Sequence, residues 1–310
     1  MDTQNIASYE HGLNLNEVFN SLDRPSLPRE VLTVNQQNGP FGIVFAIDRQ
    51  ENNNGFTIKS VKTKVEDQMP IRVTSITPEL ISDLRQIYGE NSFKLVARLL
   101  NGIARDYEND KFIEWMNNTA IKTDDLEIAT TDDCTDTWRK VLQKVQTLVL
   151  ESNVKRRTTF NAFCILPFKV AASIMGDPNA VSVFQSNERN AQKYLIAKSL
   201  STEYYLNPDP NSEFGYVGIR STHNENIDDT DNMGCGAFNA YVNEIQEITD
   251  VNANYHYVIY DRFSICSNPL HSEQTPMLYK FNIKYIERDF IEALSKPDID
   301  EVIGQWVLQR

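Results

Sequence analysis

The residues best suited to chemistry in this sequence are a cysteine between two glycines and a few histidines. Gly234-Cys235-Gly236 could place a thiol in a tight turn, where a histidine such as His256 or His271 could activate it as a nucleophile. Nothing in their spacing brings these residues together, and the simpler interpretation is a glycine turn around a small buried side chain. The four cysteines lack paired spacing and are expected to be buried, reduced thiols: Cys134, Cys164, Cys235 and Cys266.

Two acidic runs and one histidine have the residue types of metal ligands. Asp132-Asp133-Cys134-Thr135-Asp136 and Asp228-Asp229-Thr230-Asp231 carry carboxylates, but neither has the glycine and terminal glutamate of an EF-hand loop. His223 stands two residues before Glu225, whereas a metal-binding pair on a helix needs a spacing of four and a third ligand. These residues are therefore predicted to lie in solvated loops, and no metal or other cofactor is expected.

Nucleotide and nucleic-acid binding have little support. Gly215-Tyr216-Val217-Gly218 lacks the third glycine of a dinucleotide site, so a turn beside a strand is predicted there. The basic run Lys155-Arg156-Arg157 follows a helical pattern, where cations favour the negative end of the helix dipole. A formal net charge of −13 argues against a basic surface that would hold DNA. Because no converging set of titratable groups is found, the chain is not expected to be an enzyme.

A β-hairpin and a long helix are the clearest elements in the first half of the chain. The apolar run from Gly42 to Ile47 and the alternating run from Phe56 to Lys62 flank an asparagine-rich turn, which predicts a hairpin. A helix is expected to begin at the N-cap Thr77, to bend near Gly89 and to continue to Ala120. One face of this helix is predicted to be almost wholly apolar, with residues recurring every three or four positions: Phe93, Val96, Ala97, Leu100, Ile103, Ala104, Tyr107, Lys111 and Trp115.

The second half of the chain combines helices and strands with a segment that has little pattern. A second amphipathic helix is predicted from Trp138 to Asn153, then a strand from Thr158 to Leu166 and a short helix entered through Pro167. Residues 179–254, rich in asparagine and aspartate, are expected to form loops with short elements. Two strands and two terminal helices are predicted to follow, at Tyr255 to Tyr260, Met277 to Tyr285, Ile286 to Leu294 and Ile299 to Leu308. This order of elements indicates an α+β or α/β fold.

In this order the elements resemble the major capsid proteins of T4-type tailed phages and their vertex paralogues, which share the HK97-like fold. The resemblance begins at Gly42 to Ile47, which looks like the strand that enters that family's extended loop, the E-loop. It is densest from Glu79 to Gly89 and continues through the long helix, which looks like the family's spine helix. Trp138 to Asn153 with Phe160 to Ile165 resembles the elements that lead into the axial domain, and Tyr257 to Asp261 resembles a later strand.

The resemblance implies an α+β, HK97-like capsid fold with a long spine helix, peripheral and axial domains, and a short E-loop hairpin. It divides the chain into an N-terminal arm at 1–40, the hairpin and peripheral-domain strands at 41–75, and the peripheral domain with the spine helix at 76–155. An axial domain with inserted loops and C-terminal helices would occupy 156–310. The hairpin tip from Arg49 to Gly55 is shorter than is usual in the family, and residues 179–254 match it poorly.

The function that this resemblance implies is structural. The chain would self-assemble into the icosahedral head shell that encloses a phage genome, in the host cytoplasm, and would remain in the capsid of the virion. Expected partners are further copies in hexamers and pentamers, other capsid, scaffold or portal proteins, and packaged DNA without sequence-specific binding; no membrane is expected. Residues expected to contact neighbouring subunits lie at the hairpin tip and on the polar face of the spine helix: Arg49, Glu51, Asn53, Arg98 and Arg105.

Other functions stay open at this point. Within the structural class, the chain could be a minor capsid or vertex protein, or an encapsulin-like shell protein that holds protein cargo. Alternatives of another class are an α+β enzyme or ligand-binding protein, and a monomeric phage adaptor or host-interaction protein.

Overall fold

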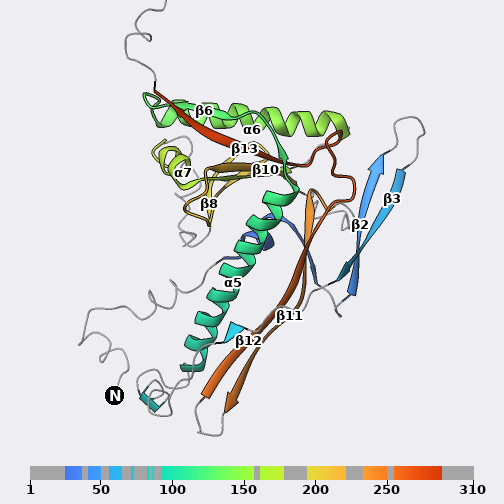
Figure 1. Cartoon of the computed structure of the whole chain (residues 1–310), viewed down its shortest axis with the longest axis vertical. Coiled ribbons are helices and arrows are strands. Elements are labelled where there is room, and N and C mark those ends of the chain that lie inside the picture. The colour runs from blue at the N-terminus through green and yellow to red at the C-terminus, as the bar shows by residue number, and fades with distance from the viewer. Residues whose placement is uncertain are drawn as a thin grey trace, which may run out of the picture.

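The computed structural model describes residues 25–36, 41–49, 56–64, 71–72, 82–83, 86, 92–156, 161–177, 194–220, 233–249 and 255–287. Within these residues, a four-stranded sheet lies alongside a long helix, a seven-stranded sheet lies at one end of that helix, and a separate hairpin projects to one side (Figure 1). No helix in the described part of the chain is long and apolar enough to cross a lipid bilayer.

The long helix α5, Ser92–Thr119, is the predicted spine helix and ends one residue before the predicted end. Its 28 residues correspond to a length of about 42 Å. The predicted start at Thr77 and bend at Gly89 lie outside the described residues.

The buried side of α5 differs from the predicted apolar face. From residue 101 onwards the buried side chains are Ala104, Glu108, Asn109, Phe112, Ile113 and Met116. In contrast, Ile103 is 45% exposed, and Tyr107, Lys111 and Trp115 are only partly buried. The buried face is therefore rotated by about one residue from the predicted one. The reason is that the short helix Leu27–Val31, from the predicted arm, packs on the side of α5 that carries Glu108 and Asn109.

The four-stranded sheet packs against α5 and has the order β1-β11-β12-β4. Its strands are β1 (Thr33–Gln36), β11 (Gly236–Thr249), β12 (Tyr255–Ser267) and β4 (Ile71–Arg72). The two long strands β11 and β12 are antiparallel, and β1 pairs with β11 in parallel. Phe263 of β12 stacks on Phe238 of β11 at 5.1 Å between ring centroids and meets Tyr107 of α5 edge-on at 6.1 Å. These rings connect the sheet to the helix.

The seven-stranded sheet has the order β5-β13-β10-β7-β9-β8, with β6 also paired to β13. Its strands are β5 (Ile121–Lys122), β6 (Leu126–Ala129), β7 (Asn161–Leu166), β8 (Leu195–Ser199), β9 (Thr202–Leu206), β10 (Phe214–Arg220) and β13 (Leu278–Ile286). Helices α6 (Cys134–Arg156) and α7 (Phe168–Ile174) lie beside it (Figure 1). Both were predicted, and α6 buries its apolar side at Trp138, Val141, Val145, Leu148 and Val149.

The expectation of loops with short elements at 179–254 was only partly right: β8, β9 and β10 are short strands, but β11 is a long strand of 14 residues. The predicted turn at Gly215 to Gly218 is in fact the middle of β10. Phe281 lies against Gly215 and Phe163 against Gly218, so closely that an added Cβ would stand 2.3 Å and 2.2 Å from the two rings. These glycines make room for aromatic side chains of the neighbouring strands, which the sequence pattern could not show.

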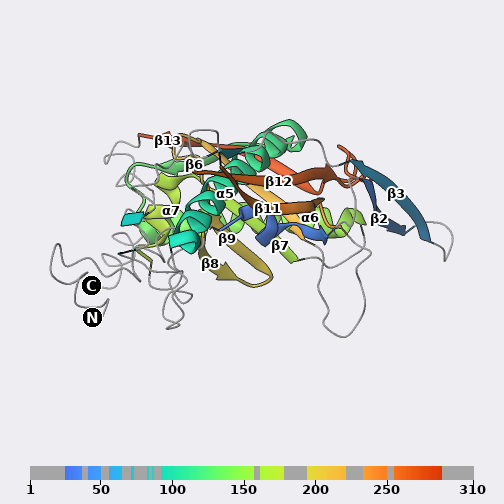
Figure 2. The same cartoon turned by 90° about the horizontal axis from the view of Figure 1, so that it is seen from below.

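The predicted hairpin is confirmed by β2 (Phe41–Arg49) and β3 (Phe56–Lys64), which pair from Phe41 with Lys64 to Arg49 with Phe56. Figures 1 and 2 show it projecting from the body of the molecule.

The chain passes more than once between the two sheets. The short helix α3 (Leu27–Val31) and β1 come from the predicted arm, yet β1 pairs with β11. In this register Asn35 lies opposite Asn239, which is 204 positions later in the sequence. The two predicted terminal helices beyond Ile286 lie outside the described residues.

Candidate assembly surfaces

The cysteine between two glycines forms a turn, as the simpler interpretation predicted. Gly234 has a φ of 56° and Cys235 is buried, and burial raises the pKa of its thiol to about 12. His271 is held elsewhere: its Nδ1 accepts a hydrogen bond from the Met277 N–H at 3.0 Å, and its Nε2 lies 3.0 Å from the Thr119 carbonyl oxygen. The side chain of His256 is outside the described part. A thiol with so high a pKa is a poor nucleophile near neutral pH.

The first acidic run forms the start of α6 instead of a metal site. Asp133 Oδ1 accepts a hydrogen bond from the Asp136 N–H at 2.8 Å, which caps the helix. Asp132 accepts a bond from the Ala129 N–H at 2.7 Å and pairs with Lys140. Among the described residues, no group of three potential metal ligands is found. The segments around His223 and Asp228 lie outside the described residues.

The basic run lies at the end of α6, where it was expected. The helix ends at Arg156, and Lys155 Nζ lies 2.5 Å from Glu151 Oε1, one turn earlier. All four cysteines are free thiols; Cys164 and Cys235 are buried, and Cys134 and Cys266 are partly exposed.

A buried ion-pair cluster fastens α3 to α5. The Glu108 side chain has no exposed surface and receives Arg29 Nη2 at 2.7 Å and Arg105 Nη1 at 2.6 Å. Burial by itself would raise the pKa of Glu108, but the hydrogen bond and charge of Arg29, with the charge of Arg105, hold it below the ordinary value. The guanidinium of Arg29 also lies 4.7 Å from the centre of the Phe238 ring. A buried charge is tolerated only with such partners, so α3 is an integral part of the subunit.

The neighbouring residue on α5 adds uncharged contacts to the same junction. Asn109 Oδ1 accepts a hydrogen bond from the Leu27 N–H at 2.7 Å, and its Nδ2 donates to the Pro25 carbonyl at 3.2 Å. From the seven-stranded sheet, Arg220 donates to the Glu30 carbonyl and pairs with Glu203. The five residues of α3 therefore connect the long helix with both sheets. Glu108 and Asn109 were missed at the sequence level, because buried polar residues interrupt an apolar pattern.

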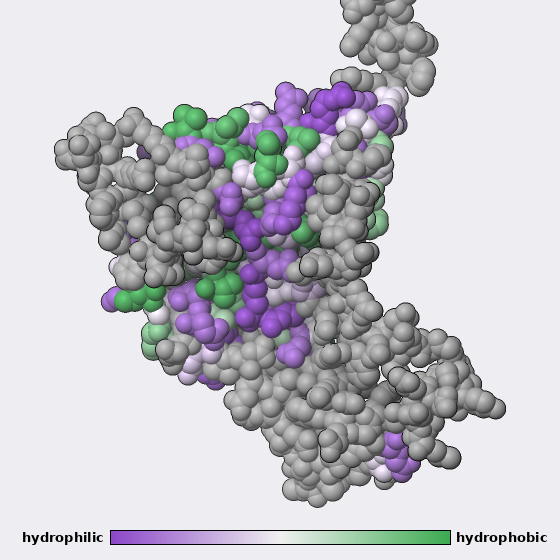
Figure 3. Space-filling view, turned by 180° about the vertical axis from the view of Figure 1, so that it is seen from behind, coloured by the Kyte–Doolittle hydropathy of each residue, from purple (hydrophilic) through white to green (hydrophobic). Residues whose placement is uncertain are grey.

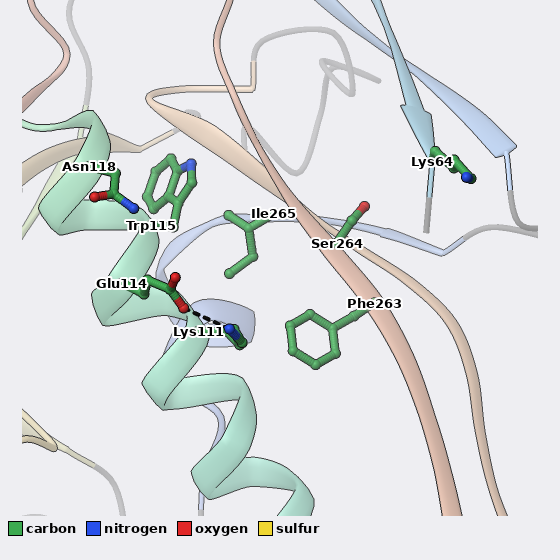
Figure 4. A pocket seen from close by; sticks show the side chains of 8 residues that line it. All are labelled: Lys64, Lys111, Glu114, Trp115, Asn118, Phe263, Ser264 and Ile265. Carbon is green, nitrogen blue, oxygen red and sulfur yellow. Dashed lines mark hydrogen bonds and ion pairs between the residues drawn. The ribbon is translucent and has the colours of Figure 1, made fainter. Parts of the chain in front are cut away.

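A cleft opens between α5, β12 and the end of β3 (Figure 4). Its volume is about 370 Å³, and its lining combines Trp115, Phe263 and Ile265 with the charged Lys64, Lys111 and Glu114, together with Asn118 and Ser264. Lys111 Nζ pairs with Glu114 Oε2 at 2.7 Å across the face of the helix. The lining of the cleft thus mixes apolar and charged side chains.

Exposed apolar side chains occur on several elements. Phe41 and Ile43, two residues apart on β2, are 71% and 52% exposed, and thus lie on one face of the hairpin. Leu150 and Val154, one turn apart on α6, are also exposed, as is Leu200 between β8 and β9. Figure 3 shows from behind that apolar residues lie in separate groups among polar ones. Such dispersed groups are consistent with several small contact surfaces.

The residues predicted to contact other subunits are only partly described. Arg49 is the last residue of β2, next to the tip, and Arg98 lies in the first half of α5, but neither side chain is described. Glu51 and Asn53 lie outside the described residues. Arg105 belongs to the internal cluster around Glu108, and its side chain is 22% exposed.

Comparisons with known proteins identify the fold of this chain. No protein-family model matches the sequence, and a search of curated proteins finds no match either. Among solved structures, the chain is similar to the virus-like particle from Pyrococcus furiosus, with a TM-score of 0.52 and 9% identity over 86% of this chain and 96% of that one. It is similar to the capsid of Ralstonia phage GP4, with a TM-score of 0.52 and 10% identity over 88% and 91%. The chain thus has an α+β, HK97-like capsid fold.

Proposed function

We propose that this chain is a structural shell protein whose copies assemble into a closed icosahedral capsid. The observation that carries the proposal is the extent of the structural likeness, which covers nine tenths or more of both solved chains. The chain therefore resembles a whole shell-forming subunit and not one module of it. Two features of the described residues could reach neighbours: the long helix, which an ion pair joins to α3, and the projecting hairpin, whose two strands are paired along their length.

Within this class we propose that the chain is a head-shell protein of a tailed phage. It would enclose DNA, as the resemblance to the T4-type major capsid proteins implies. The net charge of −13 supports this assignment, because an acidic wall does not hold DNA tightly and so permits packaging and release. A vertex or other minor capsid protein, and an encapsulin-like shell around protein cargo, are the alternatives within the class. The subunit would have a structural role in the virion, as a part of the shell, and would catalyse no reaction.

The shell would be stabilised by many modest contacts between copies and not by one tight interface. We propose that the hairpin lies over a neighbouring copy, with contacts at Arg49, Glu51 and Asn53, and that Arg98 and Arg105 take part from the helix. The exposed Phe41 and Ile43 support a contact role of the hairpin, since apolar surface gains most from being covered. The division of the chain into arm, hairpin, peripheral and axial parts is proposed on the same basis.

The proposal is tested by electron microscopy and light scattering of the purified protein, together with mass spectrometry of purified virions. Closed shells, or hexamers and pentamers, are expected. Particles that contain nuclease-protected DNA favour the phage capsid, whereas DNA-free particles with enclosed protein favour the encapsulin-like alternative. A protein that stays monomeric at all concentrations and is absent from virions would contradict the proposal.

The contact role of the hairpin tip is tested by charge reversal with a matched control. Arg49→Glu at the end of β2 is expected to raise the concentration needed for assembly. Lys59→Glu, an exposed charge reversal farther along the same hairpin, is the control and is expected to leave assembly unchanged. Equal behaviour of the two variants argues against a specific contact at Arg49.

A further inference from the structure

Leu200 lies in the turn between β8 and β9 in a backbone conformation that leucine rarely adopts. Ser199 pairs with Thr202, so Leu200 and Ser201 form a two-residue turn. Leu200 has a φ of 52° and is the only residue other than glycine with a positive φ in the described part of the chain. The first central position of such a turn is normally glycine or asparagine, because Cβ crowds the backbone there. The leucine thus lowers the stability of the turn that it forms.

The side chain of Leu200 is also unusually exposed. It is 86% exposed, more than any other large apolar residue in the described ranges. Two serines flank it, so it stands alone as an apolar group on a polar turn. Figure 2 shows this hairpin on the lower side of the coloured ribbon, below α5 and α7. Neither the backbone nor the solvent favours leucine here, so a role outside the isolated subunit is the natural explanation.

The turn is firmly held by the sheet beneath it. The Ala162 N–H of β7 donates a hydrogen bond to the Ser201 carbonyl at 3.0 Å. Immediately below the turn, Glu203 pairs with Lys198 at 2.6 Å and with Arg220 of β10. Because the base is fixed, Leu200 is presented in a defined position, and little backbone conformational entropy is lost when its side chain is covered.

We propose that Leu200 is an apolar anchor that becomes covered by a second copy of this chain during shell assembly. This inference rests on the proposed shell function. Two observations make a second copy the partner. First, β8 is the end strand of the seven-stranded sheet among the described residues, which places the turn at an edge of this sheet. Second, all copies carry the same net charge of −13, and an uncharged, apolar contact adds no further repulsion between them.

The test compares Leu200→Asn with Leu200→Met in assembly and in stability. Asparagine tolerates a positive φ and removes the apolar side chain, whereas methionine keeps the apolar side chain and the strained backbone. Leu200→Asn is expected to melt at the same or a higher temperature as an unassembled subunit, yet to need about tenfold more protein to assemble. Leu200→Met is expected to assemble like the parent. If the asparagine variant fails to fold, Leu200→Gly replaces it with the same expected result.

The outcomes separate this inference from the proposed function. If the parent forms shells and Leu200→Asn forms them at the same concentration, Leu200 is only a tolerated turn residue and the inference is wrong, while the shell function stands. If the parent never assembles, the shell function fails and the anchor fails with it. A higher melting temperature combined with weaker assembly supports the anchor, because a purely structural residue would not produce opposite changes.

Discussion

Arg29 of the arm helix α3 donates hydrogen bonds from two guanidinium nitrogens to the wholly buried carboxylate of Glu108 on α5. Its Nε lies 3.1 Å from both carboxylate oxygens, and its Nη2 lies 2.7 Å from Oε1. This charge-assisted contact joins residues that are 79 positions apart in the sequence. The described end of the arm is therefore fastened to the spine helix before any neighbouring copy is present.

Removing the charge of Glu108 is expected to destabilise the subunit strongly. In Glu108→Gln, the two arginines lose their carboxylate while still partly buried, so the free energy of unfolding should fall by about 3 kcal/mol. Glu114→Gln on the same helix is the matched control, because the ion pair of Glu114 with Lys111 is largely exposed and should contribute less than about 0.5 kcal/mol. Urea unfolding of the unassembled subunit measures both, and similar losses in the two variants would show that the cluster is not special.

The same carboxylate is expected to make stability depend on pH on the acid side. The pKa of Glu108 is lower in the folded chain than the ordinary value, so the unfolded chain binds more protons between the two values. The contribution is complete above about pH 4.3, the usual glutamate value, and is lost as the pH falls through the lower folded pKa. The difference in unfolding free energy between the parent and Glu108→Gln should therefore shrink as the pH is lowered from about 6 to about 3, a range that brackets the ordinary glutamate pKa of about 4.3. A constant difference over this range would contradict the assignment.

The cysteines are expected to differ widely in reactivity. Burial raises the pKa of both Cys164 and Cys235, and neither side chain is accessible. Cys134, at the start of α6, is partly exposed. Alkylation of the native protein at mildly alkaline pH should label Cys134 first and leave the two buried thiols unlabelled until urea is added. Peptide mass spectrometry gives the order, and rapid native labelling of Cys235 would show that its turn opens.

Adding one methyl group at Gly218 is expected to disturb the core of the seven-stranded sheet. The new Cβ in Gly218→Ala would stand 2.2 Å from the Phe163 ring, which is fully buried. The stability should fall by about 1–3 kcal/mol, as for other overpacked cores. Phe163→Leu in the same chain should restore part of the loss. If the double variant loses the sum of the two single losses, the ring and the glycine are not coupled.

The sequence pattern alone was sufficient to predict the helices and strands whose apolar residues recur with a clear helical or alternating period. The hairpin at β2 and β3, the end of the spine helix at Thr119, α6, α7 and the last two long strands agree with the predictions, because alternation and helical spacing reflect which side of an element is buried. The order of these elements was also enough to indicate the HK97-like fold. The glycine turn at Cys235 followed from the glycines alone.

Only the tertiary structure decided features that depend on partners far away in the sequence. Polar Glu108 and Asn109 are buried because α3 brings Arg29 and the Leu27 amide to them, and no local pattern on α5 contains that information. Gly215 and Gly218 belong to a strand, not to a turn, because aromatic rings of β13 and β7 fill the space that a side chain would need. The pairing of β1 with β11, whose paired residues Asn35 and Asn239 are 204 positions apart, follows equally from packing, since chain order does not dictate which strands meet.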